Sequence, residues 1–86
     1  MVYTITFKSS ADRDLERIPE TDRKRIIKRI DLLSYNPRPP GVVKISGKEN
    51  KWRIRVGKYR VIYEIHDDQL VIIVIKVDRR DDVYRK

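Results

Sequence analysis

Residues 51–65 read KWRIRVGKYRVIYEI, two stretches of alternating side chains separated by Gly57 and Lys58. Alternation rich in β-branched and aromatic residues is typical of strands, and a short Gly-containing link between two such stretches predicts a hairpin. We therefore expect strands over residues 51–56 and 59–65, joined by a tight turn.

Side chains alternate between the two faces of a strand, so each face of this hairpin has its own composition. One face is apolar and carries Trp52, Ile54, Val56, Val61, Tyr63 and Ile65. The other face carries Arg53, Arg55 and Arg60, with Glu64 as the first carboxylate in the stretch. If helices cover the apolar face, the arginines share an uncovered surface with no built-in partner, available to a negatively charged ligand.

Two helices are expected before the hairpin, after an alternating strand at residues 2–7. Ser9 or Ser10 can cap the first helix. Pro19 ends that helix, and Pro19 or Thr21 begins the second. Apolar residues at helical spacing form the inner faces: Ala11, Leu15 and Ile18 in the first helix, and Ile26, Ile30 and Leu33 in the second.

The segments after the second helix are strands and turns. Residues 36–41 read NPRPPG and cannot continue a helix, and residues 42–45 predict a short strand. The apolar run at residues 70–77 predicts a last strand that is buried on both faces. The element order is β-α-α-β-β-β-β, which predicts an α+β fold with two N-terminal helices on one face of a small, mostly antiparallel sheet of four or five strands.

The length of the chain suits one small domain, which we expect to span residues 1–86. The sequence contains no cysteine and one histidine, which excludes disulfides and metal sites built on several cysteines or histidines. No apolar stretch reaches the roughly 20 residues of a membrane span, and the N-terminus lacks the pattern of a signal peptide. We therefore expect a cytoplasmic protein without a metal or another cofactor.

The net charge of +8 is concentrated in the middle of the chain. Residues 36–66 carry 8 basic and 2 acidic side chains, a net charge of +6, whereas residues 67–86 carry 5 of each. A localised positive field attracts polyanions, of which nucleic acid is the commonest in cells. The alternative is a basic surface that serves solubility.

Arginine suits phosphate because its planar guanidinium donates two parallel hydrogen bonds. Three arginines on rigid strands would form a preorganised phosphate site. The alternative is that they pair with Glu64, Glu49 or the aspartates of the tail. A second candidate set lies in the tail, where Arg79, Arg80 and Tyr84 offer guanidiniums and a phenol, with an exposed terminus as the alternative.

Several segments of the chain occur in the order found in a known family. They are the Leu-x-x-Ile-Pro joint at residues 15–19, Asn36-Pro37, Lys44-Ile45-Ser46-Gly47, residues 52–57, residues 59–63 and residues 79–84. In this combination the chain resembles the RelE toxins of bacterial and archaeal toxin–antitoxin pairs. The resemblance implies the fold predicted above and a ribosome-dependent mRNA endonuclease. Such an enzyme cuts mRNA in the decoding site without a metal, through attack of the 2′-hydroxyl on the adjacent phosphate.

The resemblance also implies site residues. The basic sheet positions of the family fall on Arg53, Arg55 and Arg60, and its C-terminal arginine and tyrosine fall on Arg80 and Tyr84. Arg60 and Arg80 would hold the scissile phosphate and stabilise the phosphorane. Tyr84 would stack on or orient a base near the cut, and Arg53 and Arg55 would bind flanking phosphate or assist proton transfer. Four further cations are expected to bind RNA: Lys51, Lys58, Arg79 and Arg85.

The sequence departs from the family pattern at positions that concern the general base. Arg53 and Arg55 lie on a strand where some relatives carry lysine, which loses a proton more easily than arginine. Arg79 aligns with a histidine of other relatives. Asp78 and Asp81 stand where glycine and a basic residue are common, and their charges should weaken phosphate binding. The identity of the base is therefore left open.

Three side chains near the arginines have two interpretations each. His66 has the right chemistry for a base, but we expect a solvated turn residue. Glu64 could act as a base, but we expect a salt-bridge partner that orients Arg60. Trp52 could stack on a nucleobase, but its position in the alternation predicts the core.

Two other functions remain open from the sequence. A toxin of the ParE branch shares the fold and acts on DNA gyrase without cutting RNA. A non-catalytic basic domain would bind any structured RNA in a salt-sensitive way. Both toxin interpretations imply a cognate antitoxin that wraps the domain with an acidic, amphipathic segment, and the enzyme interpretation adds the ribosome and mRNA as partners.

Overall fold

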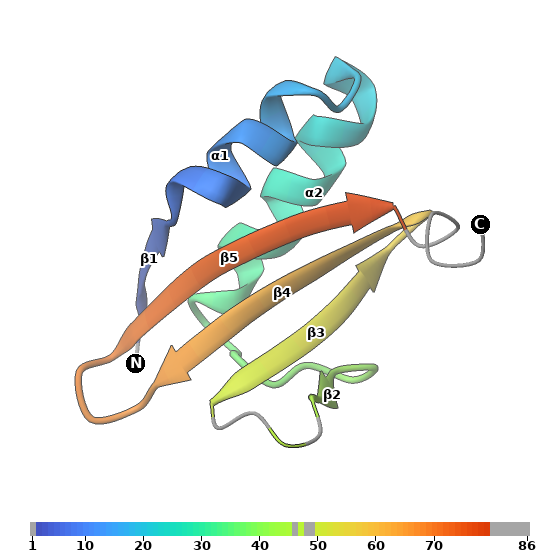
Figure 1. Cartoon of the computed structure of the whole chain (residues 1–86). Helices are drawn as coiled ribbons and strands as arrows, with labels where there is room; N and C mark the ends of the chain where they lie inside the picture. The colour runs from blue at the N-terminus through green and yellow to red at the C-terminus, as the bar shows by residue number, and fades with distance from the viewer. Residues whose placement is uncertain (1, 46, 48–49, 80–86) are drawn as a thin grey trace.

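The computed structural model describes residues 2–45, 47 and 50–79 of the chain. In this part the chain forms two helices and five strands in the predicted order (Figure 1). The elements are β1 (Thr4–Phe7), α1 (Ser9–Glu16), α2 (Glu20–Leu33), β2 (Val43–Lys44), β3 (Lys51–Val56), β4 (Tyr59–His66) and β5 (Val71–Arg79).

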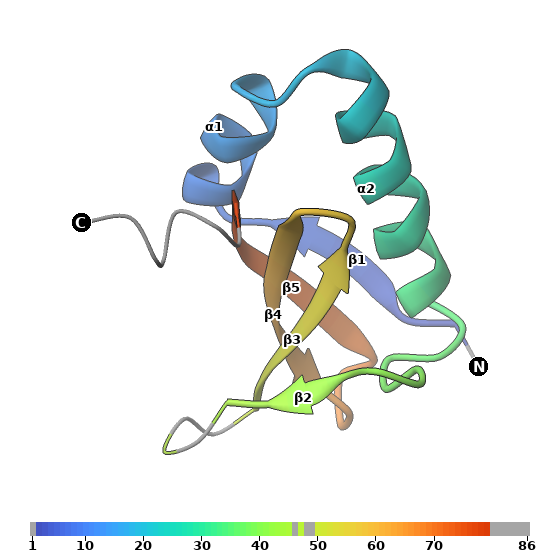
Figure 2. The ribbon, with the colours of Figure 1, turned by 90° about the vertical axis from the view of Figure 1, so that its right-hand side faces the viewer.

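The strands form one sheet in the order β1-β5-β4-β3-β2. β1 runs parallel to β5, and the other neighbouring strands are antiparallel. Both helices lie on the same side of the sheet (Figure 2). The predicted α+β fold, a mostly antiparallel sheet with helices on one face, is confirmed.

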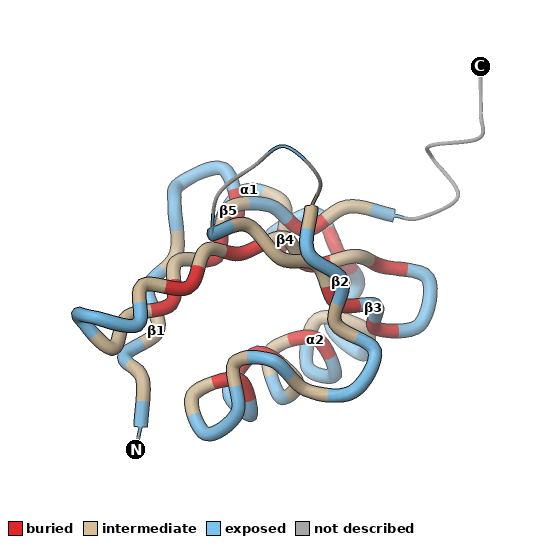
Figure 3. Tube along the Cα trace, turned by 90° about the horizontal axis from the view of Figure 1, so that it is seen from below, coloured by how far each residue is buried: buried red, intermediate tan, exposed pale blue. Residues whose placement is uncertain are grey.

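The core lies between the helices and the sheet, where the tube of Figure 3 shows buried segments facing one another. The predicted inner faces of the helices are confirmed, because Ala11, Leu15, Ile26, Ile30 and Leu33 are buried. Ile18 is buried too, but it lies in the joint after the end of α1 and not on the helix. Ile54, Val61 and Tyr63 are buried opposite them on the sheet. Every buried side chain among the described residues is apolar or aromatic. Apolar burial on one face of the sheet therefore holds the fold together.

The predicted serine cap of α1 is wrong. Lys8 occupies the N-cap position and makes no side-chain capping hydrogen bond. The Ser10 hydroxyl instead donates to the carbonyl of Ile75 at 2.7 Å. β1 pairs with β5 only as far as Val74, so the edge of β5 beyond that point needs other hydrogen-bond partners. α1 provides them, and the carboxylate of Asp14 accepts from the Val77 amide at 2.9 Å.

The prediction that the last strand is buried on both faces is wrong. Ile72, Val74 and Val77 are buried, whereas Ile73 and Ile75 are only half-buried. Ile73 lies on the face that no helix covers, and Ile75 has no partner on β4 in the register. The spacing of the buried residues changes at an irregularity in the pairing of β4 with β5, where the register shifts by one residue. A β-bulge of this kind changes which side chains face the core on either side of it.

The segment between α2 and β3 is anchored to the sheet by Tyr63. The side chain of Tyr63 is fully buried, and its hydroxyl donates to the carbonyl of Pro37 at 2.7 Å. Burial raises the pKa of Tyr63, so the phenol stays protonated and keeps donating. The strand predicted at residues 42–45 is shorter than expected and covers Val43–Lys44.

A cross-strand ion cluster joins β3 to β4 on the face away from the helices. Glu64 lies opposite Lys51 in the register, and its carboxylate accepts from the Lys51 ammonium at 2.7 Å. The other oxygen of Glu64 lies 2.9 Å from Nε2 of His66. The hydrogen bond from Lys51, followed by that from His66, lowers the pKa of Glu64. A carboxylate with a lowered pKa stabilises the folded state as long as it is ionised.

Truncation of Ile26 should be far more costly than truncation of Leu32 on the same helix. Ile26 is fully buried, and loss of its side chain leaves a cavity, so Ile26→Ala should lower the free energy of unfolding by about 2–5 kcal/mol. Leu32 is 54% exposed, and Leu32→Ala should change it by less than about 0.5 kcal/mol. Urea unfolding followed by circular dichroism measures both, and equal losses would contradict the assigned core.

Glu64→Gln should lower stability at neutral pH and have less effect in acid. The folded-state pKa of Glu64 is lowered, so its contribution is fully present above the ordinary glutamate pKa of 4.5 and is lost as the pH falls through the folded pKa. Urea unfolding of both proteins at pH 7 and pH 3 measures the change. The exposed Glu16→Gln controls for the loss of one negative charge, and a difference for Glu64→Gln that is independent of pH would contradict the ion cluster.

Candidate phosphate-binding face

The side of β3, β4 and β5 that points away from the helices forms a surface that we call the open face. Its side chains are Lys51, Arg53, Arg55, Arg60, Ile62, Glu64, His66, Ile73, Lys76 and Asp78. The predicted alternation is confirmed, because Ile54 and Val56 are buried while Arg55 between them is exposed. The arginines of β3 and β4 therefore share the face without helices.

The strand register arranges the open face in rows that run across the strands. Three rows follow from the pairing: Arg55–Arg60–Asp78, Arg53–Ile62–Lys76 and Lys51–Glu64–Ile73. Neighbouring rows are about 7 Å apart, because two residues of a strand separate them. The first two rows contain the three arginines, and the third contains the ion cluster of Glu64.

Arg60 is paired with Asp78, so the alternative in which the arginines pair with aspartates of the tail is confirmed for Arg60. Its Nε and Nη2 donate to the two carboxylate oxygens of Asp78, each at 3.1 Å. Both side chains are about one-fifth exposed. The expectation that Glu64 pairs with Arg60 is wrong, because Glu64 bonds to Lys51 and His66 two rows away. The expectation of an arginine face without any partner is also wrong for Arg60.

Arg53 and Arg55 keep their charges available. Neither forms an ion pair with any residue of the described ranges. Arg55 is exposed and lies directly opposite Arg60 in the register, so two arginines are neighbours across β3 and β4. Arg53 is half-buried, and its Nε is buried without a hydrogen-bond partner among the described residues. An unsatisfied buried donor is costly to the folded state.

Trp52 packs against the core, as predicted. It is partly buried on the side of the helices. The guanidinium of Arg38 lies 5.0 Å from the centre of its ring and the ammonium of Lys44 lies 5.7 Å from it. These cation–π contacts use the aromatic ring to hold the segment before β3, so Trp52 is not a free platform for a nucleobase.

His66 ends β4 and is not the solvated turn residue that we expected. Its side chain is 27% exposed and is bonded to Glu64. His66 lies six residues along β4 from Arg60, a distance of about 20 Å in an extended strand. The imidazole is therefore too far from Arg60 to act on a phosphate held there.

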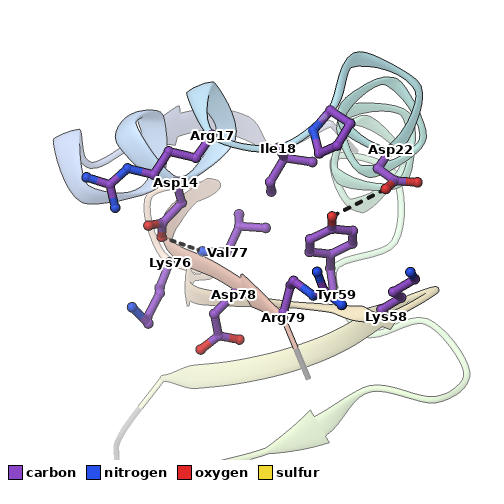
Figure 4. A pocket seen from close by; sticks show the side chains of 11 residues that line it. Asp14, Arg17, Ile18, Asp22, Lys58, Tyr59, Lys76, Val77, Asp78 and Arg79 are labelled. Atoms are coloured by element: carbon purple, nitrogen blue, oxygen red, sulfur yellow. Dashed lines mark hydrogen bonds between the residues drawn. The ribbon is translucent and has the colours of Figure 1, made fainter. Parts of the chain in front are cut away.

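A pocket of about 590 Å³ lies where the ends of β4 and β5 meet the joint between α1 and α2 (Figure 4). Tyr59 donates from its hydroxyl to Asp22 at 3.3 Å inside it. Lys58 and Arg79, which were expected to bind RNA, line this pocket, and Asp78 lies at the same place. The pocket thus adjoins the end of the open face that holds Arg60.

The tail residues of the predicted site lie outside the described residues. They are Arg80, Tyr84 and Arg85, and their roles stay predictions. Arg79 is the last residue of β5 and directly follows Asp78.

The sequence allows several carboxylates, the tail aspartates among them, as partners of the arginines, and Asp78 is the one that pairs with Arg60. Its pairing with Arg60 depends on the register of β4 against β5, which includes the one-residue shift. Alternation alone places Asp78 on the open face by counting back from buried Val77. The sequence therefore indicates the face on which Asp78 lies, but only the strand register identifies Arg60 as its partner.

The described residues contain no group of three or more histidine, aspartate and glutamate side chains that could hold a metal ion. No helix in the same part of the chain is long and apolar enough to cross a membrane.

Comparison with known proteins places the chain in a family. Residues 5–84 match the sequence model described as the ParE toxin of type II toxin–antitoxin systems. The chain is 30% identical to the toxin RelG of Mycobacterium tuberculosis, with all of both chains covered. It is 26% identical to the mRNA interferase toxin RelE of Escherichia coli, with 94% of this chain and 86% of the relative covered.

A solved structure supports the same assignment. A chain of the crystal structure of the archaeal RelE–RelB complex from Pyrococcus horikoshii matches with a TM-score of 0.82 at 29% identity. The match covers 93% of this chain and 97% of that chain. Because the family match and the relatives span nearly the whole sequence, this chain belongs to the RelE/ParE family of toxins from type II toxin–antitoxin systems.

Proposed function

We propose that this protein is a toxin that cuts mRNA in the decoding site of the ribosome and so stops translation. The observation that carries the proposal is the open face, where Arg53 and Arg55 stand beside Arg60 without ion-pair partners among the described residues. Guanidiniums fixed on strands are preorganised for the phosphates of a single strand. The RelE of Escherichia coli, a relative over most of the chain, is named an mRNA interferase.

The proposed reaction needs no cofactor. The 2′-oxygen of one nucleotide bonds to the adjacent phosphorus, and the bond from phosphorus to the 5′-oxygen breaks. The products are a 2′,3′-cyclic phosphate and a 5′-hydroxyl, with one proton leaving the 2′-hydroxyl and one reaching the 5′-oxygen. Arg60 and Arg80 hold the phosphate and stabilise the added negative charge, while Tyr84 orients a base.

The ribosome supplies what a small protein cannot. The open face has cations and two half-buried isoleucines, but its described residues place no free general base beside Arg60. Alignment of the 2′-hydroxyl with the phosphate accounts for much of the barrier in such reactions, and an mRNA held in the decoding site is already ordered. We therefore propose that cleavage depends on the ribosome, which places the protein in the cytoplasm.

A cognate antitoxin is the second proposed partner. The similar archaeal structure is a RelE–RelB complex, which is a toxin with its antitoxin. The open face combines the uncompensated charges of Arg53 and Arg55 with half-buried Ile62 and Ile73. An acidic, amphipathic segment would match both features and would block the RNA surface.

Inhibition of DNA gyrase remains the second candidate function, because the matching family is described by its ParE toxin. The two functions make different demands on the same residues. Cleavage of mRNA requires the arginines to lie at a phosphate and produces new RNA ends. Inhibition of gyrase requires neither.

The protein, added to a translation extract, should produce new mRNA 5′ ends inside codons. Primer extension maps these ends, and omission of ribosomes should abolish them. Arg60→Ala should lower the cleavage rate about 10²–10³-fold, because a fixed donor to the developing charge is lost. Arg80→Ala and Tyr84→Ala should also reduce cleavage.

Arg13→Ala is the matched control, since Arg13 is an exposed arginine of α1 on the helix side. It should cleave as the wild type does. Normal translation without new mRNA ends would refute the proposed mRNA cleavage. A gyrase supercoiling assay would then test the second candidate function. Salt-sensitive binding to any RNA without cleavage would instead identify a binding module.

A further inference from the structure

Asp78 lies in the same row of the open face as two of the arginines. The register pairs Asp78 of β5 with Arg60 of β4, and Arg60 with Arg55 of β3. Arg60 therefore stands between a carboxylate on one side and a guanidinium on the other. Like charges directly opposite one another repel, so Arg55 pushes Arg60 away while Asp78 attracts it.

The contact between Arg60 and Asp78 uses only one edge of the guanidinium. Nε and one hydrogen of Nη2 point to the two oxygens of Asp78, each at 3.1 Å. A guanidinium carries five N–H donors in a fixed plane, so Nη1 and the second hydrogen of Nη2 form another edge. That edge has no hydrogen bond to a described residue. It is the edge on which Arg60 can still bind a phosphate bidentately.

Burial makes this contact more than a surface ion pair. The side chains of Arg60 and Asp78 are 21% and 22% exposed, so both are largely packed into the face. A bidentate contact in this setting restricts the rotation of the long arginine side chain. Arg60 then has a fixed plane before any ligand arrives, and the entropy of ordering it is not lost in the reaction.

We propose that Asp78 is a positioning residue for Arg60. It holds the guanidinium by its Nε edge and leaves the second edge directed at the scissile phosphate. Its negative charge beside the phosphate weakens RNA binding at the same time. Asp78 therefore lowers the affinity for RNA while it fixes the orientation of Arg60. This pair of effects distinguishes it from a residue that merely supports the fold. The inference rests on the proposed mRNA cleavage and assigns one further residue to that site.

Asp78→Asn tests both effects of Asp78, because the orientation of Arg60 acts on kcat and the negative charge acts on KM. Single-turnover and steady-state cleavage on ribosomes that hold a defined mRNA should show kcat lowered about 10-fold or more, because Arg60 loses its fixed orientation. KM should fall, because one negative charge beside the phosphate is gone. Asp78→Glu keeps the carboxylate and should recover part of kcat.

Asp68→Asn is the matched control, because Asp68 is an exposed aspartate in the turn between β4 and β5 and the charge change is the same. It should change neither constant. An Asp78→Asn protein with unchanged or higher kcat would overturn the inference, since Asp78 would then only compete with phosphate. Equal losses in Asp78→Asn and Asp78→Glu, together with a lower melting temperature for both, would also overturn it in favour of a structural role.

A measurement without RNA separates this inference from the proposed function. In the free protein the Nε–H signal of Arg60 in a ¹H–¹⁵N spectrum should show a rigid side chain, which Asp78→Asn should make mobile. If the wild type does not cleave mRNA, the proposed function fails, and this signal still decides the contact. A mobile Arg60 in the wild type, like the exposed Arg13, would overturn the positioning by Asp78.

Discussion

One constraint organises the molecule: both helices lie on the same face of a five-stranded sheet. Side chains alternate along a strand, so every second side chain of β3 and β4 points into the core and the ones between point away from the helices. The side chains that point into the core are apolar and pack with Ile26 and Ile30 of α2. The side chains that point away from the helices include Arg53, Arg55 and Arg60. The charged face is therefore a direct consequence of how the core is built.

This arrangement gives the arginines a rigidity that a loop would not. β4 is paired on both sides, with β3 and with β5, so the backbone of Arg60 is fixed by two neighbouring strands. The charges then divide into two groups. Lys51 is neutralised by Glu64 and Arg60 is oriented by Asp78, whereas Arg53 and Arg55 have no ion pair within the described residues. The face thus combines a held guanidinium with two that have no ion pair, and the positive field of the latter attracts a polyanion.

The sequence predicted the helices, the strands of the hairpin and the placement of the arginines, because all of these depend on local periodicity. For Arg60 it left several carboxylates open as partners, the tail aspartates among them, and did not single out Asp78. The partners of Arg60 and Glu64 depend on the register between strands, and a one-residue shift within β4 and β5 separates the two rows. Ser10 shows the same limit, since its hydroxyl bonds to Ile75, a residue distant in sequence. The half-exposure of Ile73 likewise follows from the uncovered face and not from the hydrophobicity of β5.

In the function that we propose, the open face lies against the mRNA backbone at the cut. The most direct test is an electron cryomicroscopy structure of the protein on a ribosome whose mRNA carries 2′-deoxynucleotides in the decoding site, which removes the nucleophile. We predict that the open face meets the mRNA, with Arg60 within about 2.7–3.2 Å of an oxygen of the phosphate that would be cleaved. A complex in which the helices face the mRNA, or in which Arg60 lies away from every phosphate, would contradict the account.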